Sequence, residues 1–289
     1  MRWWRECAMG HPLKKSPMNL SPNQFSQIAR LARDRWGLHL TEKKISLVSS
    51  RLASFIRKSG YESVDSYLSH LEENGSEEDM LVFFDLLSTN VTSFFRDLAH
   101  FDYLEREFYT PLSRGNTTLP GREIRIWSAG CSTGCEPYSL AMNACESLSN
   151  RSEWKISILA TDLSNSAVEE ARAGVYERQQ LEKVPNEIVR KYFRSVPGQS
   201  GQIQVSDEIR GMVKVAQLNL MDSWPMKGPF EVIFCRNVMI YFDTTTRRDL
   251  VLRFHELLRP GGIFAVGSAE TLSGLKTPFR PVQASMYTK

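Results

Sequence analysis

The feature that most constrains the fold is an alternation of short apolar runs with helical stretches in the second half of the chain. Runs rich in β-branched and aromatic residues occupy 124–127, 156–160, 213–216, 232–235 and 263–266. Helical stretches at 137–149, 165–173 and 244–258 lie between several of them. Alternation of this kind predicts a parallel sheet covered by helices, because parallel strands need long crossover connections. We therefore predict an α/β fold.

The interval between the second and third runs is too long for a single crossover helix. It contains a predicted hairpin in which 202–205 returns through 207–211 to 212–216. We interpret the region at about 175–212 as a small β-subdomain inserted into, or abutting, the main sheet.

The first hundred residues predict helices instead of strands. Ser21 is placed to cap a helix, with Pro22 at its first position and Gln24 completing a capping box. Further helices are expected from Thr41 to Gly60, from Ser63 to about 71, from Ser76 onward, and up to about 109. Turn-forming residues then predict a linker. The predicted organisation is a flexible leader over 1–18, a helical domain over 19–112, a linker over 113–122 and an α/β domain over 123–289.

Length and cysteine usage narrow the class of protein. A chain of 289 residues accommodates two domains, and no apolar run approaches the ~18 residues of a membrane span. The five cysteines have no C-x-x-C spacing, which predicts reduced thiols in a cytoplasm and no metal site.

Basic residues are concentrated at the N-terminal end. Residues 1–60 hold twelve Lys or Arg and three acids, a net charge of +9, whereas the rest of the chain carries −6. Lys44, Arg51 and Lys58 are spaced by seven, so on a helix they would form one row. A basic N-terminal segment on an acidic body suggests that this segment meets a negatively charged partner, although a solvated basic face is the plainer alternative.

Polar residues follow several of the predicted strands. The first strand leads into the loop at 130–134, which contains two glycines, and then to Glu136 at a helix start. The later strand ends carry Asp162, Asn219 with Leu220, and Arg236 with Asn237. The carboxyl ends of parallel strands meet at one edge, where open α/β folds bind ligands. The loop lacks the G-x-G-x-x-G and G-K-[ST] patterns, so a ligand with an amino or sulfonium charge fits Glu136 better than a phosphate does.

Four segments carry distinctive motifs: NVTSFFR at 90–96, CSTGCEPYS at 131–139, ATDL at 160–163 and FCRNVMIYFD at 234–243. Together they closely resemble the bacterial chemotaxis-receptor protein-glutamate methyltransferases, and the likeness runs from about residue 21 to 288. The resemblance implies a Rossmann-like S-adenosylmethionine methyltransferase sheet with an N-terminal helical domain and a small β-subdomain. It places cofactor contacts on Asn90, Thr92, Arg96, Glu136, Asp162, Asn219, Leu220, Arg236 and Asn237. The family's usual second acid is Cys135 here, which leaves Glu136 as the only carboxylate of the loop.

The chemistry of this cofactor agrees with the residues. S-adenosylmethionine carries a carboxylate that Arg96 can pair with, and an ammonium and a ribose that suit Glu136 and Asp162. A glutamate acceptor has a pKa of ~4.3, so an in-line displacement at neutral pH needs no strong base. Arg96 and Tyr241 are therefore the predicted catalytic residues, which orient the acceptor carboxylate. The plainer alternatives are an ion pair of Arg96 with Asp97 or Asp102, helix caps for Asn90, Thr92 and Asp162, and a half-buried aromatic for Tyr241.

The resemblance also implies the partner. Receptors methylated by this family are helical bundles with acidic modification segments, and Lys44, Arg51 and Lys58 are the predicted substrate-binding residues. We expect a cytoplasmic monomer that binds no nucleic acid and does not insert into the membrane. Two other functions remain open. A catalytically idle signalling module would bind cofactor without forming S-adenosylhomocysteine. A nucleic-acid methyltransferase is disfavoured because no N/D-P-P-[FYW] loop follows the fourth strand.

Overall fold

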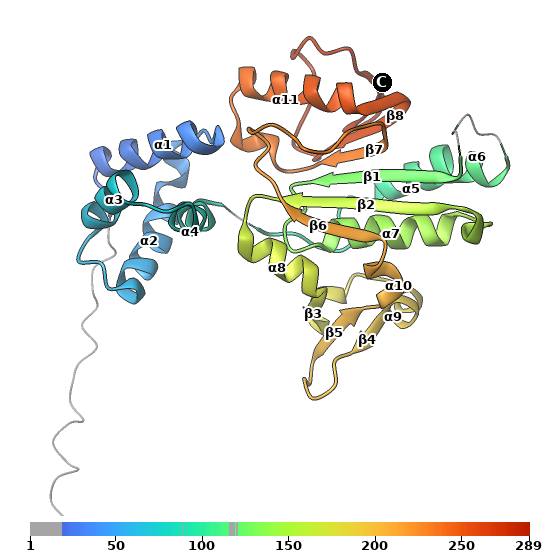
Figure 1. The fold of residues 1–289 in the computed structure, drawn as a ribbon, viewed down its shortest axis with the longest axis horizontal. Coiled ribbons are helices and arrows are strands. Elements are labelled where there is room, and N and C mark those ends of the chain that lie inside the picture. Colours follow the sequence, from blue (N-terminus) through green and yellow to red (C-terminus); the bar gives the residue numbers. More distant parts are fainter. Residues whose placement is uncertain (1–18, 89, 116–118, 120) are drawn as a thin grey trace, which may run out of the picture.

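Two parts of different architecture make up the computed structural model, which describes residues 19–88, 90–115, 119 and 121–289 (Figure 1). The described residues before 90 form helices and their connections, and those after it form a sheet with its helices. The predicted leader over 1–18 lies outside the described residues, as do 116–118 and 120 of the predicted linker. None of the described helices combines the length and hydropathy needed to cross a bilayer.

The N-terminal domain consists of α1 (Pro22–Trp36), η1 (Glu42–Lys44), α2 (Ile45–Ser59), α3 (Val64–Glu73) and α4 (Glu77–Leu87). Ser21, Ser63 and Ser76 each accept a hydrogen bond from a backbone N–H three residues later, so the predicted caps are confirmed. The second helix was expected from Thr41, but it opens with the short η1 turn before α2. Its helices bury Ile28, Leu52, Leu68 and Phe83 completely, and these side chains belong to a hydrophobic core that continues into the second part of the chain.

A seven-stranded sheet forms the centre of the second part, in the order β6-β2-β1-β7-β8-β10-β9. The strands are β1 (Glu123–Ala129), β2 (Lys155–Asp162), β6 (Val213–Gln217), β7 (Phe230–Cys235), β8 (Leu258–Val266), β9 (Arg280–Gln283) and β10 (Met286–Thr288). Strands β6, β2, β1, β7 and β8 pair in parallel, which confirms the predicted parallel sheet. The antiparallel strands β10 and β9, which the sequence reading missed, extend it at one edge.

Helices cover the sheet in the manner of a Rossmann-like fold. They are α5 (Leu98–Tyr103), η2 (Leu104–Tyr109), α6 (Thr110–Ser113), α7 (Cys135–Ser147), η3 (Arg151–Glu153), α8 (Asn165–Ala173), η5 (Met239–Tyr241) and α11 (Thr244–Leu257). Ile124 and Ile126 of β1 share one hydrophobic core with α5, η2 and α7, whereas Trp127 shares the other core with α11 and the N-terminal domain. This alternation buries both faces of the strand.

The segment over 98–113 belongs with the sheet and not with the N-terminal helices. Phe101, Leu104 and Tyr109 are buried in the same core as Ile126 and Tyr138. The predicted boundary at 113–122 is therefore corrected to the short segment that follows α4, because hydrophobic contacts, and not helical character, assign this segment to a domain.

The small β-subdomain is present, but the predicted hairpin within it is wrong. β5 (Gln202–Val205) lies between β3 (Val175–Glu177) and β4 (Phe193–Ser195) in a separate antiparallel sheet. The segment over 207–210 is the short helix α10 (Asp207–Arg210), and β6 pairs with β2 of the main sheet. The helices η4 (Arg178–Leu181) and α9 (Asn186–Tyr192) complete the subdomain. β5 and β6, which are close in sequence, therefore belong to different sheets.

The N-terminal domain lies beyond the carboxyl ends of the parallel strands, toward which β1 and β2 point in Figure 1. Leu38 forms an isolated antiparallel bridge with Phe242, and the N–H of His39 donates to the carbonyl of Tyr241 at 2.7 Å. Asp85 of α4 accepts a 2.8 Å hydrogen bond from Ser166 of α8. These contacts place the helical domain against the edge where the predicted ligand-binding residues gather.

Candidate functional site

A cavity of about 270 Å³ lies between the two domains at this edge. All nine predicted cofactor-binding residues line it: Asn90, Thr92, Arg96, Glu136, Asp162, Asn219, Leu220, Arg236 and Asn237. Tyr241 also lines it. The N-terminal domain adds Trp36, Leu38 and Phe84, an apolar wall that the sequence reading missed. The residues come from segments far apart in the chain, and the parallel sheet brings them together as predicted.

The loop after β1 approaches the cavity without a side chain at Gly130. Gly130 has a φ of 81°, and a Cβ there would lie 2.2 Å from Cγ2 of Val238. Only glycine tolerates both this conformation and this contact. Ser132 continues the loop with a hydroxyl that donates to the carbonyl of Asn90 at 2.9 Å, which links the loop to the start of the second part.

Asp162 fixes two backbone segments at the end of β2. Its carboxylate accepts from the N–H groups of Ser132, at 2.7 Å, and Ser164, at 3.0 Å. The cap of α8 is Ser164, whose hydroxyl accepts from Ala167 at 3.1 Å, so the helix-cap alternative for Asp162 is wrong. Burial raises the pKa of Asp162, while the two N–H groups favour its ionised form.

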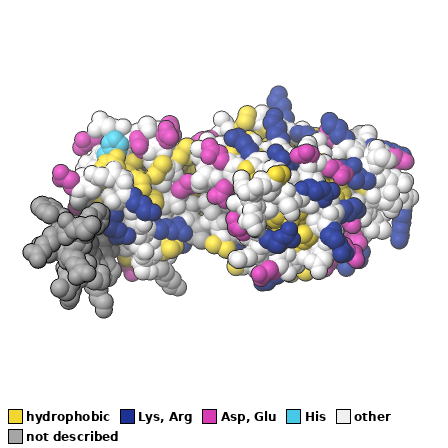
Figure 2. Space-filling view, turned by 90° about the horizontal axis from the view of Figure 1, so that it is seen from below, with side chains coloured by type: hydrophobic (Ala, Val, Ile, Leu, Met, Phe, Trp, Pro, Cys, Tyr) yellow, Lys and Arg dark blue, Asp and Glu magenta, His cyan; other side chains and the backbone are white. Residues whose placement is uncertain are grey.

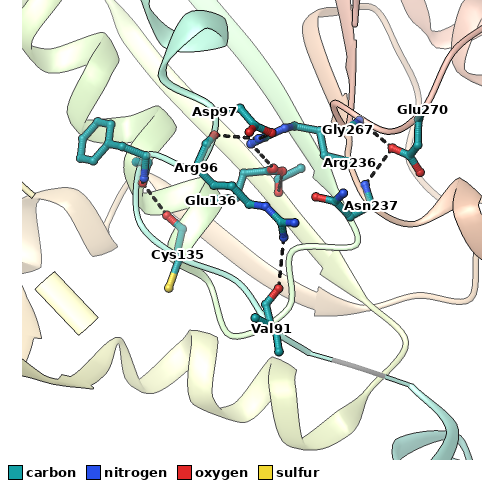
Figure 3. Close-up of polar contacts among 12 residues, drawn as sticks. Val91, Arg96, Asp97, Cys135, Glu136, Arg236, Asn237, Gly267 and Glu270 are labelled. Carbon is teal, nitrogen blue, oxygen red and sulfur yellow. Dashed lines mark hydrogen bonds and ion pairs between the residues drawn. The ribbon is translucent and has the colours of Figure 1, made fainter. Parts of the chain in front are cut away.

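A buried cluster of charges forms the opposite wall (Figure 3). The guanidinium of Arg236, 2% exposed, donates to Glu136 at 3.0 Å and to Asp97 at 2.6 Å. It also donates to the backbone carbonyl of Arg96 at 2.7 Å, and Ser128 donates to Glu136 at 2.7 Å. Burial raises the pKa of Glu136, and Arg236 opposes this by favouring the carboxylate. The cluster therefore holds Glu136 in a fixed position at the cavity wall.

Arg96 remains available to a ligand. Its guanidinium donates to the carbonyl of Val91 at 3.2 Å, and the side chain is half-buried. Among the described residues it has no acidic partner within ion-pair distance, and Asp97 is bound by Arg236 instead. The alternative in which Asp97 or Asp102 pairs with Arg96 is therefore wrong. A cation without an acidic partner at the wall of a cavity is suited to a ligand carboxylate.

The opening of the cavity combines apolar side chains with one cation. Val91 and Ile240 line the cavity and are 76% and 50% exposed, so they lie at its rim. The ammonium of Lys44 lies 3.8 Å from the centroid of the Tyr241 ring, a cation–π contact between the two domains. Partial burial lowers the pKa of Lys44.

The three residues predicted to bind substrate occupy different environments. Lys44 lies in η1, ahead of α2, and contacts Tyr241. Arg51 is half-buried, and its guanidinium donates to the carbonyls of Leu86 and Ser88 at the end of α4. Lys58 is exposed. The predicted row is thus not a uniform solvent-facing surface, because one of its cations binds the domain's own backbone.

Cys135, which follows the glycine loop, is a neutral group. It is fully buried, and burial raises the pKa of its thiol to about 12. At neutral pH it adds no charge, and Glu136 supplies the carboxylate of this segment.

Two acidic residues beside the cavity were not among the predicted site residues, and Asp97 was expected only as a possible ion-pair partner of Arg96. Asp97 follows the predicted Arg96 directly, and Glu270 follows the fifth strand at the same sheet edge. Glu270 follows β8 at the same sheet edge at which Asp162 ends β2, so its position after a parallel strand is the signal that identifies it. No local pattern identifies Asp97, because its partner Arg236 is 139 residues away.

Comparisons with known proteins cover nearly all of the chain. Residues 90–288 match the family model described as CheR methyltransferase, SAM binding domain, where SAM is S-adenosylmethionine. Residues 23–88 match the model described as CheR methyltransferase, all-alpha domain. The two matches meet where the structure places the domain boundary.

Several curated proteins are similar over the same range. A chemotaxis protein methyltransferase of Borreliella burgdorferi is 37% identical over 261 residues, 90% of this chain and 92% of that protein. The protein of that name in Escherichia coli is 36% identical over 263 residues, covering 90% and 88%. Among solved structures, a methyltransferase from Mesorhizobium loti has a TM-score of 0.29 and 18% identity over 54% of this chain and 51% of that chain.

Proposed function

The chain belongs to the CheR methyltransferase family, and we propose that it methylates the side-chain carboxylate of specific glutamates on chemotaxis receptors. It is an S-adenosylmethionine-dependent methyltransferase, and the products are glutamate methyl esters and S-adenosylhomocysteine. One observation carries the proposal: the nine predicted cofactor-binding residues, which come from five segments of the chain, line one cavity.

The residues present fit the cofactor. S-adenosylmethionine carries one carboxylate, one ammonium, one sulfonium and a ribose diol. The cavity offers one guanidinium without an acidic partner, Arg96, and two carboxylates held in place by hydrogen bonds, Glu136 and Asp162. Trp36 and Phe84 give it an aromatic side. Arg96 is opposite in sign to the cofactor carboxylate, Glu136 is opposite in sign to the ammonium, and Asp162 offers an acceptor to the ribose diol.

We assign roles on this basis. Arg96 would bind the cofactor carboxylate, Glu136 the ammonium or ribose, and Asp162 the ribose diol. Asn90, Thr92, Asn219, Leu220 and Asn237 would supply the remaining polar and backbone contacts. Arg236 lines the cavity, but both of its Nη atoms bind protein groups, so we assign it to holding Glu136 and the Arg96 backbone in position.

When bound, the cofactor supplies an electrophilic methyl group on a positively charged sulfur. The protein then has to orient the acceptor and keep water out. A glutamate side chain is ionised at neutral pH, since its pKa is ~4.3, and it needs no base. Tyr241 and Arg96 would orient the acceptor carboxylate, and Lys44 beside Tyr241 adds positive potential at the opening. Alignment in a site shielded by the helical domain supplies most of the rate enhancement.

The proposed partner is the helical bundle of a chemotaxis receptor. We propose that the enzyme acts on it as a cytoplasmic monomer, which binds no nucleic acid and does not insert into the membrane. The receptor's acidic modification segment would approach the opening past Val91 and Ile240, beside Lys44, and the exposed Lys58 in the last turn of α2 would extend the contact along the helical domain. Arg51 would support this surface from within, because its guanidinium ties α2 to the end of α4.

The test is methyl transfer from radiolabelled cofactor to receptor-containing membranes. We expect base-labile label on the receptor and stoichiometric S-adenosylhomocysteine. Arg96→Ala is the matched control and should abolish labelling. A folded wild-type protein that binds cofactor but labels no receptor would contradict the proposal, and label on added polynucleotide would indicate a nucleic-acid methyltransferase.

A further inference from the structure

Glu270 lies behind the cavity wall and makes an unusual set of contacts. It is 8% exposed and follows β8, outside the residues that line the cavity. One carboxylate oxygen accepts from the N–H groups of Gly267, at 2.6 Å, and Asn237, at 2.8 Å. The other accepts from the N–H of Ile240 at 3.1 Å. One side chain thus satisfies three backbone donors from two loops, of which Figure 3 shows those of Gly267 and Asn237.

The loop that Glu270 holds is part of the site. Asn237, Val238, Ile240 and Tyr241 all line the cavity. Asn237 has a φ of 60°, the left-handed region that a residue with a side chain adopts at a cost. Such a conformation persists only where surrounding contacts enforce it. The Glu270 carboxylate bonds the N–H of this residue directly.

Gly267 allows the two loops to approach this closely. A Cβ at Gly267 would lie 2.7 Å from Nδ2 of Asn237 and 2.8 Å from a carboxylate oxygen of Glu270. Both distances are too short for any side chain, so this position accepts only glycine in the observed arrangement. Gly267, Glu270 and Asn237 therefore form one packed unit behind the cavity.

We propose that Glu270 is a positioning residue for the methyl-transfer site, acting through the backbone of Asn237 and Ile240. A carboxylate is required because all three partners are donors, and an amide would direct its own N–H groups at one of them. Loss of these bonds would release the loop that presents Asn237 and Tyr241, without removing any group that touches the ligand. The inference rests on the proposed function for its consequence in catalysis, but its effect on cofactor binding can be measured alone.

The experiment compares Glu270→Gln with Glu231→Gln. Glu231 is a matched control because it is also buried, at 6% exposed, and accepts a backbone N–H, from Arg125 at 2.7 Å, but it lies near the amino end of β7. Calorimetry with S-adenosylhomocysteine and with S-adenosylmethionine gives Kd for each variant, and thermal unfolding gives Tm.

We expect Glu270→Gln to raise Kd about ten-fold and Glu231→Gln to leave it within about two-fold, although both lower Tm. Gly267→Ala should raise Kd in the same direction, which keeps the proposal testable if Glu270→Gln does not fold. Equal Kd values for wild type and Glu270→Gln, or equal increases in both glutamate variants, would overturn it. Because these titrations contain no receptor, failure of receptor methylation by the wild type would count only against the proposed function.

Discussion

Buried ionised groups dominate the site at the level of single residues. Arg236 and Glu136 are buried and Asp97 is partly buried, and the guanidinium of Arg236 bonds both carboxylates. Removal of one member leaves the others uncompensated, which costs more than a surface ion pair is worth. Arg96 differs, because its guanidinium, among the described residues, has no acidic partner and donates to the Val91 carbonyl.

Arg96→Ala and Asp162→Ala should each weaken cofactor binding ten-fold or more, since each removes a charged hydrogen bond of ~1.5–3 kcal/mol. The structure separates their effects on folding. Arg96→Ala should leave Tm near the wild-type value, whereas Asp162→Ala should lower it because Ser132 and Ser164 lose their acceptor. Calorimetry and thermal unfolding check both. Unchanged affinity in either variant would refute that assignment.

Cofactor affinity should also depend on pH through Glu136. Burial raises its pKa above the usual value of ~4.3, so acid protonates it earlier than an exposed glutamate. Since the folded pKa is raised, its contribution to stability is present at low pH and is lost as pH rises through that pKa. Binding changes in the opposite direction, because only the carboxylate attracts an ammonium.

We therefore expect Kd to rise as pH falls from about 7 toward about 5. The Glu136→Gln variant should bind the cofactor more weakly at pH 7, and its Kd should depend less steeply on pH. The pH dependence that remains in this variant would come from Asp162. Titrations of both proteins over this range measure the difference. Parallel curves for the two proteins would assign the dependence to another group.

At the level of elements, side chains at helix ends determine where several elements begin and end. Ser21, Ser63 and Ser76 cap the N-termini of helices in the N-terminal domain. Lys289 caps the C-terminus of α11. Its ammonium donates to the carbonyls of His255, at 2.6 Å, and Leu258, at 2.7 Å. A cation at a helix C-terminus satisfies free carbonyls and opposes the helix dipole.

Lys289→Ala should lower the free energy of unfolding by about 1 kcal/mol, because two charged hydrogen bonds at the end of α11 are lost. Lys214→Ala is the matched control, since Lys214 is exposed on β6. Denaturant titration measures both, and the control should lie within about 0.5 kcal/mol of wild type. Equal stabilities for the two variants would mean that the cap contributes nothing.

At the level of the whole molecule, the helical domain completes the cavity that the sheet begins. Trp36, Leu38 and Phe84 form one wall, and the Leu38–Phe242 bridge joins the domains. Basic side chains are not confined to the helical domain, since Figure 2 shows Lys and Arg interspersed with acids over the α/β domain. Residues 90–289 hold 24 Lys or Arg and 22 Asp or Glu, so the α/β domain has a small positive net charge and neither sign dominates this face.

Charge reversal on the helical domain should separate partner recognition from cofactor binding. Lys58→Glu is expected to lower kcat/KM for receptor methylation several-fold with an unchanged cofactor Kd, because the side chain is exposed and outside the cavity. Arg51→Glu should additionally lower Tm, because its guanidinium binds carbonyls of α4. Lys214→Glu serves as the control. A Lys58→Glu protein as active on receptor as the control would remove this surface from the proposed partner site.

The sequence by itself determined the identity of most elements and the edge at which the site forms. Capping residues such as Ser21 act on backbone groups three residues away, and strand and helix periods are local, so both can be read without a structure. The convergence of Glu136, Asp162 and Asn237 was also predictable, since parallel strands place their carboxyl ends together.

Tertiary structure alone decided which segments pair and which charges meet. Gln202–Val205 pairs with β3 and β4 instead of with Val213–Gln217, because the register and partner of a short strand depend on packing across the molecule. Arg236 meets Asp97 only once the second part has folded, and Arg51 meets the end of α4 only once the helical domain has folded. Lys44 meets Tyr241 only where the two domains pack together. Such contacts join residues far apart in the chain, so no local sequence pattern predicts them. They form because the folded arrangement that contains them has the lowest free energy.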